Sequence, residues 1–592
     1  MQLSNLDWSI IIGFFILSIV IGIIASKKAG KSYSDFFLSG RNMPWWLLGF
    51  SMVATTFSAD TPNLVTDIVR KNGVSGNWQW WAFLLTGMLT VFVYAKLWRR
   101  SGVKTDLEFY ELRYSGKAAA FLRGFRALYL GVFFNIVIMA TVSLAAIKIG
   151  GVMLGLSPIQ TILIASIVTV IYSSLGGLTG IIWTDFVQFI IAMVGVIGAA
   201  YVVVNLPEVG GVANLLEHPN VSDKLNVIPD FNDMDALVPF FILPLAIQWW
   251  SVWYPGAEPG GGGYIAQRML SAKNENHAIG ATLFFNFAHY ALRPWPWILV
   301  ALASLIVFPD HASLREAFPH LPEHVINDDL AYPAMMTFLP KGLLGLVLAS
   351  LIAAFMSTIS TQLNWGSSYV VNDFYKRFVK PEASEKELVN IGRISTVVLM
   401  ILAGYIALKM ESALGAFNII LQIGAGTGLI FILRWFWWRI NAWSEVTAMV
   451  VSFFVALFFE FVTPDLATHM RLILGIAITT AAWLAVTFIT QPTEHHTLLN
   501  FYKLIKPHAT GWQAVIQPAI SQGELKEAEV EPGKLPLELV CMVAGCFLVY
   551  GVLFSVGFFL YGKTGKAMLG VAVAAITAFI LIKSWNKVKG KS

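Results

Sequence analysis

Long apolar runs alternate with short polar segments along nearly the whole chain. A helix that crosses a membrane needs about 20 consecutive apolar residues, and the sequence offers about 15 such runs. They lie near residues 7–26, 43–70, 78–98, 121–153, 156–176, 178–206, 236–256, 275–308, 333–372, 389–409, 412–435, 443–463, 468–490, 536–561 and 566–586. The pattern therefore predicts an all-α protein that passes through a membrane many times.

Two of these predicted spans contain residues that interrupt a helix. Residues 51–63 read SMVATTFSADTPN, and residues 253–264 read WYPGAEPGGGGY, with two prolines and five glycines. Irregular backbone at membrane depth is tolerated only where it lines a cavity. One break opens the five spans 43–206 and the other opens the five spans 236–435, and such paired breaks point to an inverted-repeat transporter. Taken singly, a kinked packing helix and a re-entrant loop remain the alternatives.

A third polar feature lies within the predicted span 333–372. Ala354, Ser357, Thr358 and Thr361 follow the i, i+3, i+4, i+7 rule, so they share one face of a helix. Their hydroxyl oxygens, facing the free carbonyls of a broken helix, would suit a sodium ion. The alternative is that these hydroxyls only hold helices together or bond to their own backbone.

The spans divide the chain into seven parts. They are an extra N-terminal span and first loop (1–42), a first five-helix repeat (43–206), an extracellular loop (207–235), a second five-helix repeat (236–435), two additional spans (436–490), a cytoplasmic connector (491–535), and two C-terminal spans with a basic tail (536–592).

Composition and charge narrow the class of protein. Apolar residues make up 57% of the chain and charged residues 13%, which excludes an ordinary soluble enzyme. The net charge of +5 is spread over loops, so nucleic acid is not expected as a partner, and two cysteines exclude a disulfide framework. Basic loops follow the first and third spans, while alternate loops are acidic. The positive-inside rule then places the N-terminus outside the cell membrane and the C-terminus in the cytoplasm.

Four segments are specific enough to compare with known families: SDFFLSGR (34–41), GGLTGIIWTDFVQ (176–188), YIAQRMLSAKN (264–274) and AAFMSTISTQLN (353–364). Together they resemble the sodium/solute symporter family, which includes sodium–glucose, sodium–galactose, proline, sialic acid and iodide carriers. The resemblance implies a LeuT-type fold of five plus five inverted helices, with one extra N-terminal and about four extra C-terminal helices. It also implies a sodium-coupled symporter in the lipid bilayer, not an enzyme, with a monomer as the functional unit.

The resemblance also implies two sodium sites. The first falls on the carbonyls of Ala54, Phe57 and Ala354 and the hydroxyls of Ser357 and Thr358. The second falls on Asp185, Ser360 and Thr361. Because the second set is intact in this sequence, we expect two sodium ions per cycle. Asp185 also stands out by itself, since a carboxylate within a span is a functional candidate; the alternative is that it caps the following helix.

The expected solute is a sugar or a sugar-like molecule, with an amino acid or a carboxylate as alternatives. By similarity, its contacts come from Thr56, Ser58, Thr61, Gln79, Trp80, Trp253, Tyr254, His289 and Gln422. His289 departs from the family, because the galactose carrier has a lysine there. Glu258 has three possible roles: contact with a cationic solute group, an ion pair with Arg293, or exposure to the cytoplasm. A sodium-independent channel and a membrane-embedded transferase are the rival functions, although the sequence contains neither a repeated filter motif nor an HExxH-type cluster.

Overall fold

The computed structural model describes residues 3–29, 33–252, 258–410, 413–530 and 533–589. Within these ranges the chain is helical, and an isolated bridge between Met43 and Ala272 is its one β contact. Twelve of the described helical segments are long and apolar enough to cross a membrane. Together with the two broken segments and the first part of the helix that starts at Pro158, they correspond to the predicted spans.

The first repeat follows helix α1 (Asn5–Ala29) and the short α2 (Tyr33–Leu38). It comprises α3 (Trp45–Thr56), α4 (Asp60–Asn72), α5 (Trp78–Trp81), α6 (Leu84–Leu89), η3 (Thr90–Tyr94), α7 (Ala95–Ser101), α8 (Glu108–Arg113), α9 (Gly116–Leu128), η4 (Tyr129–Phe134), α10 (Asn135–Leu154) and α11 (Pro158–Val204). Gly177 divides α11, because its φ of 53° and ψ of −166° are not helical. The two spans predicted at 156–176 and 178–206 therefore meet at this glycine.

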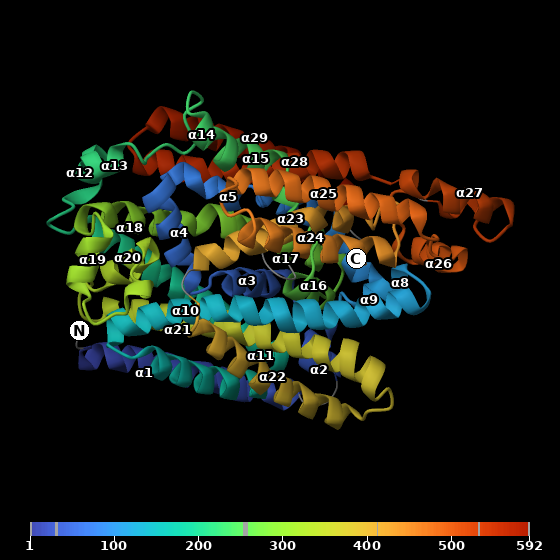
Figure 1. The fold of residues 1–592 in the computed structure, drawn as a ribbon, viewed down its shortest axis with the longest axis horizontal. Helices are drawn as coiled ribbons and strands as arrows, with labels where there is room; N and C mark the ends of the chain where they lie inside the picture. Colours follow the sequence, from blue (N-terminus) through green and yellow to red (C-terminus); the bar gives the residue numbers. More distant parts are fainter. Residues whose placement is uncertain (1–2, 30–32, 253–257, 411–412, 531–532, 590–592) are drawn as a thin grey trace.

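The second repeat follows the extracellular loop. It comprises α14 (Met234–Leu237), η5 (Val238–Ile242), α15 (Leu243–Ala246), η6 (Gln248–Trp250), α16 (Gly263–Leu270), α17 (Glu275–Phe287), η7 (Ala288–Leu292), α18 (Pro294–Val307), α21 (Leu343–Ser368), η10 (Tyr369–Val379), α22 (Glu385–Ala407) and α23 (Ala413–Leu433). In Figure 1 the helices of both repeats run along the long axis of the molecule, with α3 and α16 near its middle.

The remaining helices lie at the two ends and along one side of this bundle (Figure 1). At the left-hand end are α12 (Gly211–Glu217), α13 (Pro219–Ser222), α19 (His311–Ala317) and α20 (Ala331–Met336), and at the right-hand end are α26 (His495–Ile505) and α27 (Gln513–Ser521). The other additions are α24 (Ala442–Phe461), α25 (Thr468–Ile489), α28 (Leu535–Leu560) and α29 (Thr564–Val588). The acidic loops thus share one end, opposite the connector.

The last two spans are tied to the core. The indole N–H of Trp295 donates to the carbonyl of Leu553 at 2.7 Å, and the Tyr550 hydroxyl donates to the carbonyl of Trp81 at 2.8 Å. Helix α28 therefore packs on elements of both repeats.

Both predicted breaks are present. Helix α3 ends at Thr56, and Phe57 follows with a non-helical φ of −87° and ψ of 68°. Helix α4 then begins at Asp60 and holds Pro62 in its first turn, where the missing N–H costs no hydrogen bond. The second break lies before α16, where Gly260 and Gly261 have φ values of 88° and 89°. Only glycine adopts such angles without strain, which explains the run of glycines in the sequence.

Candidate functional site

A buried carboxylate joins three helices at the end of α3. Asp185, in the second half of α11, accepts hydrogen bonds from the hydroxyls of Ser51 on α3 and Ser357 on α21, both at 2.6 Å. All three side chains are fully buried. A carboxylate in this setting is stabilised by charge-assisted hydrogen bonds, which are shorter and stronger than neutral ones.

Arg268 on α16 completes this cluster. Its guanidinium lies 3.8 Å from the Asp185 carboxylate and donates to the hydroxyls of Ser51 at 3.2 Å and Thr361 at 3.0 Å. Neither Arg268 nor Ser51 is among the site residues predicted from the sequence. The signal was available, because Arg268 is a charged residue within a family motif beside an apolar span, and such residues are functional candidates by default.

The end of α3 contacts the hydroxyl face of α21 directly. Thr358 donates to the carbonyl of Thr55 at 2.8 Å, and the hydroxyls of Thr55 and Thr361 lie 3.2 Å apart. The neighbouring carbonyl of Ala54 accepts from the N–H of Phe57 at 3.0 Å. Ala354, one turn before Thr358, is buried at 3% exposure. The structure thus brings Thr358 of the predicted first sodium set against the last turn of α3, beside Ala54 of the same set.

The predicted second sodium set is only partly assembled. Asp185 and Thr361 both face Arg268, whereas the hydroxyl of Ser360 donates to the carbonyl of Ser357 on its own helix at 3.1 Å. Ser357 connects the two sets, because it belongs to the first and donates to Asp185 in the second.

A polar cavity adjoins the break between α3 and α4. Five predicted solute-binding residues line it: Thr56, Ser58, Thr61, Trp80 and His289. Two charged side chains, Asp60 and Arg293, line the same cavity. The rest of its wall is largely apolar and comes from α4, α10 and α23: Leu64, Val65, Ile138, Thr141, Phe417 and Ile420. Thr55 lies on both this wall and the α21 contact, so the cavity and the oxygen-rich cluster are neighbours.

His289 is positioned by Thr56 and Arg293. Its Nδ1 lies 3.0 Å from the Thr56 hydroxyl and 2.6 Å from Nη2 of Arg293. Because a guanidinium can only donate, Nδ1 acts as the acceptor in that contact. The ring also packs edge-on against Trp80, with ring centroids 5.7 Å apart.

Two other predicted solute contacts, Gln79 and Gln422, do not line this cavity. Gln79 is not among the residues that line the cavity, and its main-chain carbonyl accepts from the side chain of Gln248 at 2.7 Å. Gln422 is buried on α23, two residues beyond Ile420, and its Oε1 has no hydrogen-bond partner within the described ranges. Trp253 and Tyr254 lie outside the described residues.

Glu258 does not pair with Arg293 and is buried, so two of its three possible roles, the pair with Arg293 and exposure to the cytoplasm, are not found in the structure. Its carboxylate forms ion pairs with Arg126 of α9 and, at 3.3 Å, with Arg434 at the end of α23. Arg434 in turn pairs with Glu445 of α24 at 3.3 Å. Glu258, which lies within the second break, therefore contacts α9 and the end of α23, whereas Arg293 contacts Val53 of α3.

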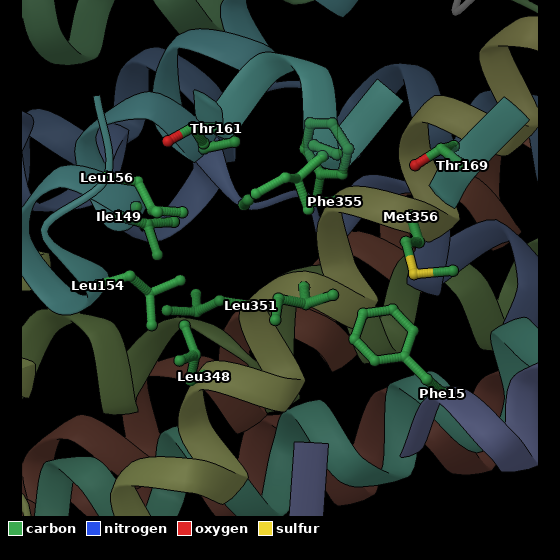
Figure 2. Close-up of a pocket in the computed structure, with 16 residues that line it drawn as sticks. Phe15, Ile149, Leu154, Leu156, Thr161, Thr169, Leu348, Leu351, Phe355 and Met356 are labelled. Atoms are coloured by element: carbon green, nitrogen blue, oxygen red, sulfur yellow. The ribbon is translucent and has the colours of Figure 1, made fainter. Parts of the chain in front are cut away.

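A second cavity is apolar and reaches the break between α3 and α4 at Ala59. Figure 2 shows side chains such as Phe15, Leu351, Phe355 and Met356 converging on it. Its walls come from α1, α10, α11 and α21, and Thr161 and Thr169 are the polar side chains that the described chain contributes to its lining. This crevice offers no charged partner to a polar solute.

Comparison with known proteins agrees with this architecture. The model of the "Sodium:solute symporter family" matches residues 36–452. A sodium/glucose cotransporter of Vibrio parahaemolyticus is 28% identical over 467 residues, which cover 75% of this chain and 83% of that protein. A mouse sodium/myo-inositol cotransporter is 27% identical over 74% of this chain, and the match spans 64% of the mouse protein. A rabbit sodium/glucose cotransporter is 26% identical over 76% of this chain and 71% of its own length.

A solved structure shares the fold. It is a sodium-coupled sialic acid symporter in a substrate-bound, outward-open state, with a TM-score of 0.66 and 21% identity. The match covers 83% of this chain and all of that one. The family model spans more than half of the chain, which therefore belongs to the sodium:solute symporter family, as a LeuT-type, sodium-coupled transporter and not an enzyme.

Proposed function

We propose that the protein imports a sugar or sugar-like solute together with two sodium ions per cycle. Glucose and myo-inositol are the solutes in the names of its relatives. A cavity with hydroxyl groups and the aromatic face of Trp80 suits such a molecule, because polyhydroxylated rings need both hydrogen bonds and an apolar surface. An amino acid and a simple carboxylate are the alternatives.

The first sodium ion is assigned to the carbonyls of Ala54, Phe57 and Ala354 and the hydroxyls of Ser357 and Thr358. One observation carries this assignment: Thr358 contacts the last turn of the broken helix through the Thr55 carbonyl. The second ion is assigned to Asp185, Ser360 and Thr361. Its support is the position of the Asp185 carboxylate, which is buried within hydrogen-bonding distance of Ser357.

The solute is assigned to the cavity beside α4. The proposed contacts are Thr56, Ser58, Thr61, Trp80 and His289, which line it, together with Gln79, Trp253, Tyr254 and Gln422. The cavity meets the sodium region at Thr55. This adjacency lets a bound ion influence how firmly the broken helix holds the solute.

The coupling follows from that arrangement. Sodium, bound between α3 and α21, holds the broken helix in place and so raises the affinity for the solute. Such coupling between sites is typically about 1–3 kcal/mol and is reciprocal. Each sodium ion that moves down a potential of 100 mV releases about 2.3 kcal/mol, so two ions supply about 4.6 kcal/mol. The helix bundle then rocks against the scaffold, which closes the site to the outside and opens it to the inside.

The orientation in the membrane follows from loop charge. We place the end that carries α26 and α27 in the cytoplasm, the N-terminus outside and the basic C-terminal tail inside, across the cell membrane. The unit that performs transport is a single chain, because both proposed sodium sets and the cavity are built from one copy.

A double substitution tests the sodium assignment. The variant S357A/T358A should lose sodium-driven uptake of glucose and myo-inositol into liposomes and lose sodium-dependent thermal stabilisation. A matched control is S452A/T396A, because both hydroxyls are buried and bond only to carbonyls of their own helices. Full sodium-driven uptake by S357A/T358A would refute the site. Equal uptake in potassium alone would instead favour the sodium-independent channel.

A further inference from the structure

Arg293 is a buried charge without an acidic partner in the described chain. Five arginines are fully buried: Arg113, Arg126, Arg268, Arg293 and Arg434. Three of them lie within 4 Å of a carboxylate, either Glu258 or Asp185. Arg113 is instead held by three main-chain carbonyls at 2.9–3.2 Å. Arg293 also has no carboxylate within 4 Å among the described residues. Unlike Arg113, it lines the solute cavity.

The guanidinium of Arg293 is fixed in place but weakly bonded. It lies over the rings of Phe57 and Trp297, at 5.8 and 5.2 Å from their centroids. Apart from its 2.6 Å contact with His289 Nδ1, its bonds to protein acceptors are 3.2–3.4 Å long. A bound carboxylate could therefore replace several long contacts with two parallel, charge-assisted hydrogen bonds, the geometry that a guanidinium fork favours.

Asp60, the acidic residue that lines the cavity, differs from Arg293 because main-chain groups already contact its charge. Asp60 is the first residue of α4, and its carboxylate interacts with the main-chain N–H groups of Asp60 and Thr61. The positive end of a helix therefore already meets its charge. The remaining lone pairs of this carboxylate can accept hydrogen bonds from hydroxyl groups. The cavity thus offers one positive charge without an acidic partner among the described residues, at Arg293. On its α4 side it offers hydrogen-bond acceptors for the hydroxyl groups of a solute.

We propose that the solute is a sugar acid, whose carboxylate binds Arg293 while its hydroxyl groups bind the α4 side of the cavity. This inference rests on the proposed function, because it takes the cavity as the solute site. It differs from transport of a neutral hexose, for which Arg293 would stay without an anion. It also differs from transport of an amino acid, whose ammonium group would have to share the Asp60 carboxylate with the N-terminal end of α4.

Matched pairs of probes test the proposal. The full-length protein in liposomes is given D-glucuronate with D-glucose, D-galacturonate with D-galactose, and L-proline, under an inward sodium gradient. We expect at least one sugar acid to have an apparent affinity at least tenfold above that of its neutral parent. Equal or better uptake of the parent sugars, preference for proline, or uptake of none of the five would each overturn the sugar-acid assignment. Sodium-dependent thermal stabilisation of the protein is measured separately, and it tests whether the sodium assignment is right independently of the solute.

Substitutions of Arg293 locate the preference. Arg293→Gln should reduce the ratio of acid to parent affinity to about one, while sodium still stabilises the protein, and Arg293→Lys should retain part of the ratio. Arg113→Gln is the matched control, since Arg113 is equally buried and lies outside the cavity, and its ratio should match that of the wild type. If Arg293→Gln keeps the wild-type ratio of acid to parent affinity, Arg293 does not bind the carboxylate. If that variant does not fold, the ratio measured for the wild-type protein decides whether the solute is a sugar acid.

Discussion

Neutralising Asp185 should leave the buried charge of Arg268 uncompensated. The two groups lie 3.8 Å apart. At an effective dielectric constant of about 20, their attraction at that distance is about 4 kcal/mol. This agrees with the 3–5 kcal/mol that removal of one partner from a buried ion pair typically costs. We therefore expect Asp185→Asn to lower the free energy of unfolding by about 4 kcal/mol in sodium-free buffer.

A double-mutant cycle separates the ion pair from other effects. Asp185→Asn, Arg268→Gln and the double variant are unfolded by SDS in mixed micelles, with potassium replacing sodium. If the pair is the cause, the double variant loses at least about 2 kcal/mol less than the sum of the single losses, because no lone charge remains. Losses that add within about 0.5 kcal/mol would refute this reasoning, since independent sites behave in that way.

Three further predictions concern packing and charge elsewhere. Gly428→Ala should yield no folded protein, measured as loss of the monodisperse peak in size-exclusion chromatography, because a Cβ at this position would collide with the main chain of η6. Gly475→Ala is the control: the space around Gly475 is open, so this variant should give the wild-type peak. Glu258→Gln should lower the free energy of unfolding by about 3–5 kcal/mol, because its two buried arginines lose an acidic partner; unchanged stability in SDS titration would contradict this. Burial opposes ionisation of Asp328, but its bond to Arg70 holds its pKa below the usual value, so this stabilisation is complete above about pH 4 and is lost as the pH falls further. Hydrogen exchange of residues 323–330 should accelerate over that acidic range, and Arg70→Gln should reduce the pH dependence to the part that His311, 3.2 Å from the same carboxylate, supplies.

Local features of the sequence were sufficient to predict the spans and their breaks. Hydrophobic length is a property of each segment, and a glycine such as Gly177 or Gly260 shows where a helix must change direction. The face shared by Ser357 and Thr358 was likewise predictable, because helical periodicity alone places them side by side.

The partners of charged residues were not predictable in this way. Glu258 meets Arg126 and Arg434, which lie more than 100 residues away on either side, and no local pattern distinguishes them from Arg293. The same holds for Arg268, whose relation to Asp185 exists only once α16 packs beside α11. Sequence identified Asp185 as expensive within a membrane, but only the packing shows which charges neutralise one another.

The shared hydroxyl of Ser357 affects how the sodium stoichiometry has to be measured. A hydroxyl has one proton and two lone pairs, and Ser357 gives its proton to Asp185, which leaves its lone pairs for a cation. Asp185→Asn should therefore weaken the first sodium site even in a transporter that uses one ion. A loss of sodium affinity in that variant does not count ions. The number of sodium ions is instead obtained from the reversal potential of solute uptake in liposomes that contain the wild-type protein. We expect two net positive charges to move with each neutral solute, or one with each sugar acid. If the solute is neutral and only one charge moves with each solute molecule, the mechanism has no second sodium ion, while the role of Ser357 stays the same.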